Sequence, residues 1–195
     1  MTQLDARLND LLEPLRTHGV GELLHALAGA IDAGAEVTPE PLRRDGDGSV
    51  LREGPLSLPE RGDLLTVRDG RRLVQRVDGT LVEGFEPVTL VADGGFTTVI
   101  SPFRWGAAEA RIEAVQARPD WQPIRLWYLD WFQPKMGDVA PDLCGALHAM
   151  QGPYQTDGGW CLEIDFGSAP TAAVPALIAA CGRTGALRLR IGHGL

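Results

Sequence analysis

The stretch WCLEIDFGSAPTAAVPALIAACGRTGALRLRIGHGL, residues 160–195, decides the fold class of the C-terminal half. Apolar and polar residues alternate over 160–166 and again over 187–191, as in strands that bury one face. Between these runs, Gly167–Pro170 interrupts the first strand, and 172–181 is rich in Ala and Leu as in a helix. The pattern predicts a β-α-β unit, with two parallel strands in one sheet and a right-handed crossover.

Upstream of this unit the chain carries further strand and helix patterns. We expect strands at 96–100 and 124–132, helices at 107–117 and 141–150, and a loop at 151–159. This order predicts a mixed sheet with helices mostly on one face.

The N-terminal half has a different pattern. Leucine stripes at helical spacing over 3–16 and 20–34 predict a helical hairpin, because Pro14 and the glycines at 19 and 21 interrupt them. A long loop with one short strand is expected over 36–63, and Asp-Gly turns between alternating runs from residue 64 predict a β-meander. The fold class is therefore α+β, with an acidic half at 1–95 and an α/β half at 96–195 that can pack as one domain.

The charge balance excludes several kinds of partner. The formal net charge is −8, and residues 1–95 hold 17 acidic and 10 basic residues. Nucleic acids and anionic membranes attract positive surfaces, so we expect neither as a partner.

No apolar run is long enough for a transmembrane helix, and no signal-peptide pattern opens the chain. The three cysteines have no C-x-x-C spacing, and reduced thiols in the cytoplasm are expected.

The five tryptophans gather between residues 105 and 160. A strand at 124–132 places Trp127 and Trp131 on one face, and both of its faces are largely apolar. Such a cluster is either an aromatic binding groove or a core between two layers. The loop before Trp160 mixes glycine with Tyr154 and Asp157, as binding loops do, although it can equally be a plain connection. The candidate binding residues are Trp127, Trp131, Tyr154, Asp157 and Trp160.

Two carboxylates form the first candidate catalytic pair. Glu163 and Asp165 lie two residues apart on one strand face, about 6.5–7 Å from each other by the strand rise. A pair at this separation suits acid/base hydrolysis. If the strands of the closing unit are neighbours, however, Arg188 and Arg190 pair with these carboxylates on an ordinary solvent-exposed face.

Cysteine and histidine form the second candidate group. Cys144 and His148 are four residues apart on an expected helix, and Cys161 and His193 follow later. These residues could bind zinc, or Cys161 and His148 could form a nucleophile and base. Their gaps match no zinc module, and buried cysteines usually serve packing, so neither a metal nor a cofactor is predicted. Nucleotide-binding, serine-hydrolase and zinc-peptidase motifs are absent from the sequence.

Two functional classes remain, and the sequence favours the first over the second. The first is a small acidic cytoplasmic bacterial protein that acts as a non-enzymatic protein-interaction module, such as a regulator or a toxin-neutralising immunity protein, with another protein as its partner. The second is an enzyme of uncommon type that uses Glu163 and Asp165, or Cys161 and His148. An exposed aromatic patch would favour the first class, and carboxylates in a pocket without arginine partners would favour the second.

Overall fold

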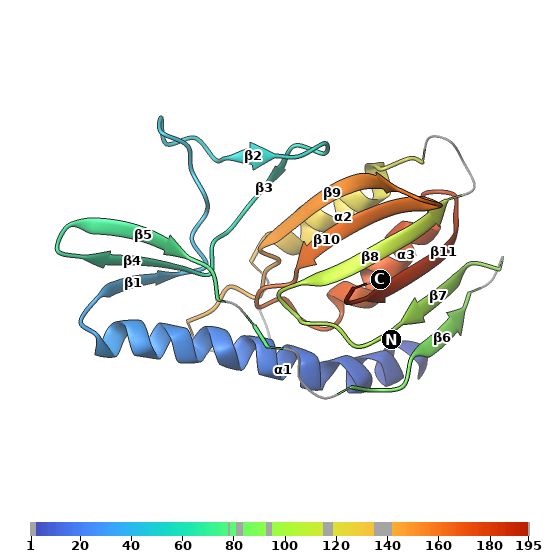
Figure 1. Cartoon of the computed structure of the whole chain (residues 1–195), viewed down its shortest axis with the longest axis horizontal. Helices are drawn as coiled ribbons and strands as arrows, with labels where there is room; N and C mark the ends of the chain where they lie inside the picture. The colour runs from blue at the N-terminus through green and yellow to red at the C-terminus, as the bar shows by residue number, and fades with distance from the viewer. Residues whose placement is uncertain are drawn as a thin grey trace.

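A six-stranded mixed sheet forms the centre of the protein (Figure 1). The computed structural model describes residues 3–77, 79–80, 84–92, 95–114, 119–134 and 142–194. The sheet has the strand order β6-β7-β11-β8-β10-β9. Its strands are β6 Val88–Val91, β7 Thr97–Ile100, β8 Ala108–Ala114, β9 Ala149–Thr156, β10 Gly159–Asp165 and β11 Ala186–Gly192. Among the strands in the described residues, only β7 and β11 pair in parallel, so the expected mixed sheet and the α+β class are confirmed.

The closing β10-α3-β11 unit is present, with α3 at Ala173–Gly182. Strand β8 lies between β10 and β11 and is antiparallel to both, so β10 and β11 are parallel to each other. They are not neighbours, and this removes the expected pairing of carboxylates with arginines. Glu163 lies opposite Glu109 of β8, and Arg188 forms an ion pair with Glu113 at 3.7 Å.

The expected helix at 107–117 is wrong, because 108–114 is strand β8. Its residues have good helix propensity, but Ala108, Ala110 and Ile112 alternate with charged residues and are completely buried in the sheet. A strand between β10 and β11 satisfies its backbone on both sides, and this tertiary context overrides the local preference.

The expected strand at 124–132 is also wrong, since Gln122–Phe132 is helix α2 with Pro123 in its first turn. Ile124, Trp127 and Tyr128 are spaced as one helical stripe, and all three are buried. Figure 1 shows α2 and α3 together behind the six-stranded sheet, on the same face.

The segment before β10 differs from expectation as well. The helix expected at 141–150 is absent from the described residues 142–150, where an extended segment leads into β9. The loop expected at 151–159 is mostly strand, because β9 and β10 pair antiparallel and Asp157–Gly158 forms the turn between them.

A single helix, α1 Gln3–Asp32, replaces the expected helical hairpin. Pro14 lies inside it, and Gly19 lies where the helix crosses Trp105. A Cβ atom at Gly19 would be only 2.8 Å from the Cβ of Trp105, so this glycine permits a close approach and does not end the helix. In Figure 1 this helix runs beneath the six-stranded sheet and beneath a smaller three-stranded sheet. Among the described residues, no helix combines the length and the apolarity that a bilayer span requires.

Two small sheets complete the fold. The three-stranded sheet has the order β1-β4-β5, and the two-stranded sheet pairs β2 with β3. These strands are β1 Glu36–Pro39, β2 Arg52–Glu53, β3 Leu58–Pro59, β4 Leu64–Arg68 and β5 Arg71–Gln75. The first three lie within 36–63, so the expectation of a loop with one short strand there is wrong. The predicted hairpins at Asp69–Gly70 and between β6 and β7 are confirmed, whereas Asp78 and Leu81–Val82 of the meander lie outside the described residues.

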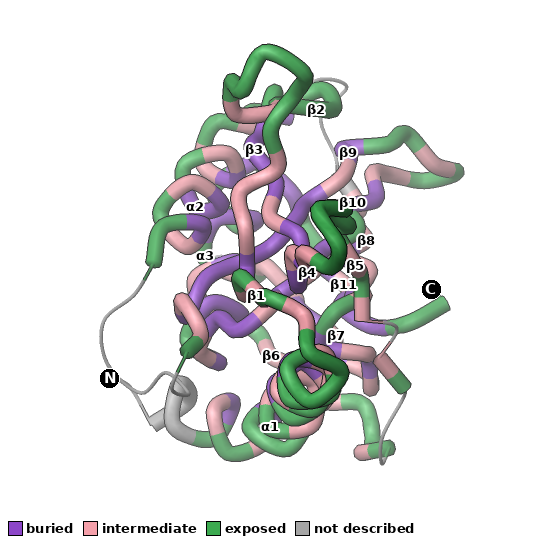
Figure 2. Tube along the Cα trace, turned by 90° about the vertical axis from the view of Figure 1, so that its left-hand side faces the viewer, coloured by how far each residue is buried: buried purple, intermediate pink, exposed green. Residues whose placement is uncertain are grey.

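The main core lies between the six-stranded sheet, α2, α3 and the first half of α1. Leu8, Leu12 and Leu15 of α1 join this core, while Leu23 and Leu27 pack with Leu64 in a smaller one. Figure 2 shows the buried segments concentrated in the central sheet and the exposed ones on α1 and the small sheets. One helix therefore contributes to both cores.

Candidate functional site

A buried histidine with two carboxylate partners lies where the small three-stranded sheet meets the central sheet. The Nδ1 atom of His148 is 2.6 Å from an oxygen of Asp63, and its Nε2 atom is 2.7 Å from an oxygen of Glu40. The His148 side chain is 1% exposed. Because ionised carboxylates only accept hydrogen bonds, both ring nitrogens must donate, and His148 is an imidazolium cation.

The backbone fixes His148 from several directions. Its N–H donates to the carbonyl oxygen of Asp165 at 3.0 Å, and its carbonyl accepts from the N–H of Arg61 at 2.8 Å. The Tyr128 hydroxyl donates to the carbonyl of Pro59 at 2.6 Å and is 3.3 Å from that of His148. Hydrogen bonds from helix α2, β10 and the segment before β4 therefore fix the position of His148.

Gly167 makes room for the imidazole ring. It has a positive φ of 52°, and a Cβ atom there would lie 2.2 Å from Cδ2 of His148. Any larger residue would collide with the ring, so the turn after β10 requires glycine at this position.

The charged groups of this cluster stabilise one another in their ionised forms. Burial alone would lower the pKa of His148, but Asp165, Asp63 and Glu40 outweigh burial and raise this pKa to about 10. Burial would raise the pKa of Glu40, yet His148, the Ser168 hydroxyl and the N–H of Cys144 bind its carboxylate and lower it. Glu40 therefore stays ionised and His148 stays protonated at neutral pH.

Asp165 is the more exposed of the two cluster carboxylates that line a pocket, the other being Asp63. Its Oδ2 atom is 3.9 Å from Nδ1 of His148, and its side chain is 21% exposed. Burial and the nearby charge of Asp63 raise its pKa to about 6, against the opposing effect of His148. A carboxyl group with this pKa can exchange a proton near neutral pH, as a general acid must.

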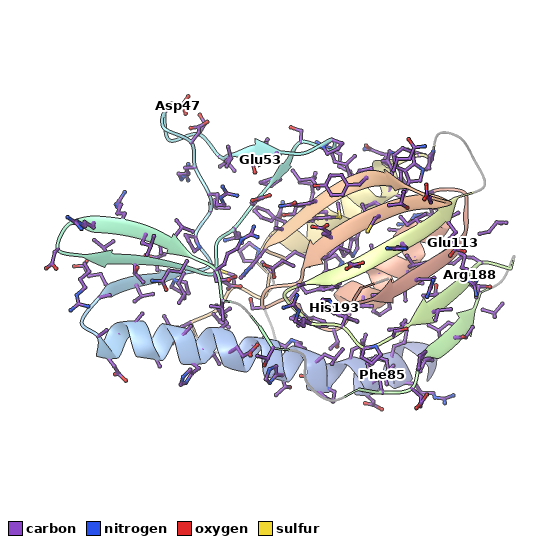
Figure 3. The ribbon with its side chains drawn as sticks, in the orientation of Figure 1. Asp47, Glu53, Phe85, Glu113, Arg188 and His193 are labelled. Atoms are coloured by element: carbon purple, nitrogen blue, oxygen red, sulfur yellow. The ribbon has the colours of Figure 1, made fainter. Side chains whose placement is uncertain are left out.

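The pocket has a volume of about 320 Å³. It lies where the chain leaving β5 passes the open face of the central sheet, the face away from α2 and α3. Its charged and polar lining consists of Asp63, Arg76, Arg104, Glu109, Gln151, Glu163, Asp165 and His193. Figure 3 shows His193 at this end of the sheet, away from the Arg188–Glu113 pair. Glu163 and Asp165 therefore share one wall of a polar pocket.

The cluster also contains a possible set of metal ligands. Ligand atoms of Asp63, His148 and Asp165 lie within 4.8 Å of one another, and this is the only such group in the described part of the chain. A metal would need a ring nitrogen of His148 to be deprotonated, but hydrogen bonds to Asp63 and Glu40 engage both ring nitrogens. The observed arrangement fits a proton-bound cluster better than a metal centre.

The cysteines do not join His148 through their thiols. Cys144 contributes its backbone N–H to Glu40, and Cys161 is buried on β10 opposite Arg111. Burial raises the pKa of both thiols, which disfavours the reactive thiolate. The predicted combination of Cys144, His148, Cys161 and His193 is therefore not brought together within the described residues.

The predicted aromatic binding residues are spread over the molecule. Trp127 is buried and donates from Nε1 to the carbonyl of Ala173 at 2.9 Å, and Trp131 is half-buried against the main core. Trp160 is half-buried and packs edge-on against Trp121. Tyr154 is exposed on β9, and Asp157 is exposed in the following turn. Most of this aromatic surface is used for packing.

Sequence reasoning missed Glu40 and Asp63. Both lie in the Pro- and Gly-rich region that was expected to be loop, and 108 and 85 positions separate them from His148. A carboxylate beside a short strand gives no local sign of a partner so distant along the chain. Comparison with protein-family models, with curated proteins and with solved structures finds no match.

The His148 cluster predicts a distinct pH dependence of stability. The folded-state pKa of His148 is raised from 6.5 to about 10, so its contribution is complete below pH 6.5 and is lost as the pH rises to about 10. We expect the free energy of unfolding to fall over this range, by up to about 1.4 kcal/mol per pH unit. Denaturant titrations between pH 7 and 9 measure this slope.

His148→Gln provides the control for this pH dependence. The variant should be less stable at pH 7, and its stability should change little between pH 7 and 9. If wild type and variant have the same slope, another group is responsible.

Proposed function

We propose that the pocket is the active site of a hydrolase in which Asp165 is the general acid and Glu163 is the general base. The observation that supports this best is that both carboxylates line one pocket, while Arg188 lies with Glu113 and Arg190 lies opposite Arg111. Arg76 and Arg104 line the same pocket, and the charge of Arg76 acts to lower the pKa of Asp165, but among the described residues no arginine lies within ion-pair distance of either carboxylate.

The two carboxylates have different surroundings, as acid and base require. Asp165 is mostly buried beside Asp63, so it holds a proton near pH 6. Glu163 is exposed to water on the same strand face, about 6.5–7 Å along the strand. This spacing leaves room for one water molecule between Glu163 and a substrate bond held at Asp165.

The proposed reaction adds water across a bond. Glu163 accepts a proton from water as the water oxygen attacks the substrate, and Asp165 gives its proton to the leaving oxygen. Proton exchange with solvent then restores both groups. Asp63 is a positioning residue, because its carboxylate is held by His148 and by the N–H of Val77 and keeps the pKa of Asp165 high.

The lining favours an uncharged substrate with several hydroxyl groups. Carboxylates accept hydrogen bonds from hydroxyls, and the guanidinium groups of Arg76 and Arg104 donate to them. A strongly charged molecule of either sign would meet like charge on one side of the pocket. We therefore place small glycosides first among the substrate classes.

A panel of p-nitrophenyl glycosides and esters tests this proposal. We expect one glycoside class to be hydrolysed, with kcat/KM at least about 100-fold lower in Asp165→Asn and in Glu163→Gln. The wild-type rate should fall as the pH rises above about 6, because Asp165 must be protonated.

Asp157→Asn is the matched control, since Asp157 is exposed in the turn after β9 and lies outside the pocket. It should retain the wild-type rate. The absence of turnover across the panel, or an Asp165→Asn variant that keeps its rate, would overturn the proposal.

A protein-interaction role in a bacterial cytoplasm is the second candidate function. The acidic composition and the three free cysteines support it. Its structural support is β5, an exposed edge strand of the three-stranded sheet. The tryptophans do not supply this support, because most of them pack against the core.

A further inference from the structure

Strand β5 lies at the edge of the three-stranded sheet. It pairs with β4 on one side, and within the described part of the chain no strand pairs with its other side. Figure 1 shows the order α1, β1, β4, β5, with β5 outermost and the sheet standing clear of the central one. An unpaired edge presents backbone N–H and C=O groups that a further strand can bind.

The turn fixes which of these groups face outward. Asp69 and Gly70 have positive φ values of 50° and 73°, which is the geometry of a type I′ turn. Arg68 and Arg71 then close the hairpin as a hydrogen-bonded pair, and hydrogen-bonded pairs alternate along the ladder. The backbone groups of Arg72 and Val74 therefore point away from β4.

This edge is basic in an otherwise acidic protein. Residues 64–76 contain four arginines and one aspartate, whereas the whole chain has a net charge of −8. In the described part of the chain, no carboxylate lies within ion-pair distance of Arg68, Arg71 or Arg72. The local field attracts a negatively charged partner.

The same edge carries exposed apolar side chains. Leu73 is 59% exposed and Val74 is 48% exposed, on opposite faces of the strand. Arg72 shares a face with Val74, and Arg71 shares the other face with Leu73. An added strand with alternating apolar and acidic residues can cover Leu73 on one face and place its carboxylates beside Arg72 on the other. Two copies of β5 paired with each other would instead bring arginines together, which disfavours self-association.

We propose that β5 binds an extended acidic segment of a partner protein, which adds to the β1-β4-β5 sheet as a further strand. This inference rests on the interaction role proposed as the second function and does not depend on catalysis in the pocket. Main-chain hydrogen bonds at Arg72 and Val74 supply affinity, and the arginines select the acidic sequence.

Selection of random nonapeptides displayed on phage tests the proposal. The peptides enriched on wild-type protein should alternate Asp or Glu with Val, Ile or Leu. The best peptide should bind at least about tenfold more weakly to Arg72→Glu, because like charges then oppose each other, and should bind unchanged to Arg52→Glu, an exposed arginine on β2.

Two further measurements separate edge pairing from charge attraction alone. Val74→Pro removes the outward N–H without breaking a bond to β4, and it should abolish peptide binding while the fold persists. Hydrogen exchange of the Arg72 and Val74 amides should be fast in the free protein and slow with bound peptide.

Three outcomes would overturn the proposal. These are enriched peptides without acidic residues, binding that survives Val74→Pro, and amide protection that rises with protein concentration without peptide. The last result would identify a second copy as the occupant. Loss of glycosidase activity in Asp165→Asn affects none of these readouts, so each proposal can fail separately.

Discussion

His148→Ala should lower the free energy of unfolding by about 3–5 kcal/mol at pH 7, because it leaves the carboxylates of Glu40 and Asp63 buried without their cation. Glu40 is 1% exposed, so its carboxylate loses its cation without gaining contact with solvent, whereas Asp63 also lines the pocket and keeps the N–H of Val77 as a donor. Denaturant unfolding followed by circular dichroism measures the loss.

The matched histidine control is His193→Ala. His193 is exposed at the pocket, so its replacement should change stability by less than about 0.5 kcal/mol. Replacement of both carboxylates by neutral amides tests more directly whether unpaired buried charge causes the loss of stability. In the background of Glu40→Gln and Asp63→Asn, His148→Ala should cost much less than in wild type. An equal cost in both backgrounds would mean that lost packing, rather than stranded charge, explains the result.

Phe166→Ala should cost about 3–5 kcal/mol as a large core truncation. Phe166 is completely buried, and its ring lies 4.8 Å from Trp105, 6.1 Å from Phe103 and 6.4 Å from Trp127 between centroids. Its N–H also donates to the carbonyl of Trp105 at 3.1 Å, so relaxation around the cavity would disturb a backbone bond. Thermal and denaturant unfolding both report the loss.

Phe96→Ala removes the same atoms from a half-buried position against the core and should cost clearly less. Because Asp165 precedes Phe166, the core variant should also shift the titration of that carboxyl, which carbon-detected NMR can follow. A loss below about 1 kcal/mol would show that the aromatic cluster closes around the missing ring.

The closing β10-α3-β11 unit was predictable because its patterns are local. Trp160–Phe166 has a strict alternation, α3 follows a break at Gly167–Pro170, and each boundary falls within about two residues of the structure. Two of the wrong elements, at 107–117 and 124–132, were also encoded in the sequence. Residues 108–113 alternate, and α2 has apolar residues at helical spacing, but good helix formers in the first and aromatic residues in the second favoured the opposite structures.

The candidate site was only half predictable for a different reason. His148 and Asp165 stand out through their chemistry, although His148 was expected on a helix and lies in the extended segment before β9. Glu40 follows β1 and Asp63 precedes β4, and they become partners only when these strand ends reach His148 in the folded chain, which no local pattern encodes. The arginine partners of Glu163 and Asp165 were expected on a neighbouring strand, and the insertion of β8 between β10 and β11 separates them.

The distance along the chain between Glu40 and His148 also bears on the order of folding. Contacts between residues 108 positions apart carry a high loop-closure cost, so they form after the hairpins and the β9-β10 pair. The carboxylates consequently remain hydrated through the early stages, and their desolvation coincides with the arrival of the imidazolium. In the reverse direction, separation of this cluster is a natural first step of unfolding, which would release the three-stranded sheet while the central sheet persists.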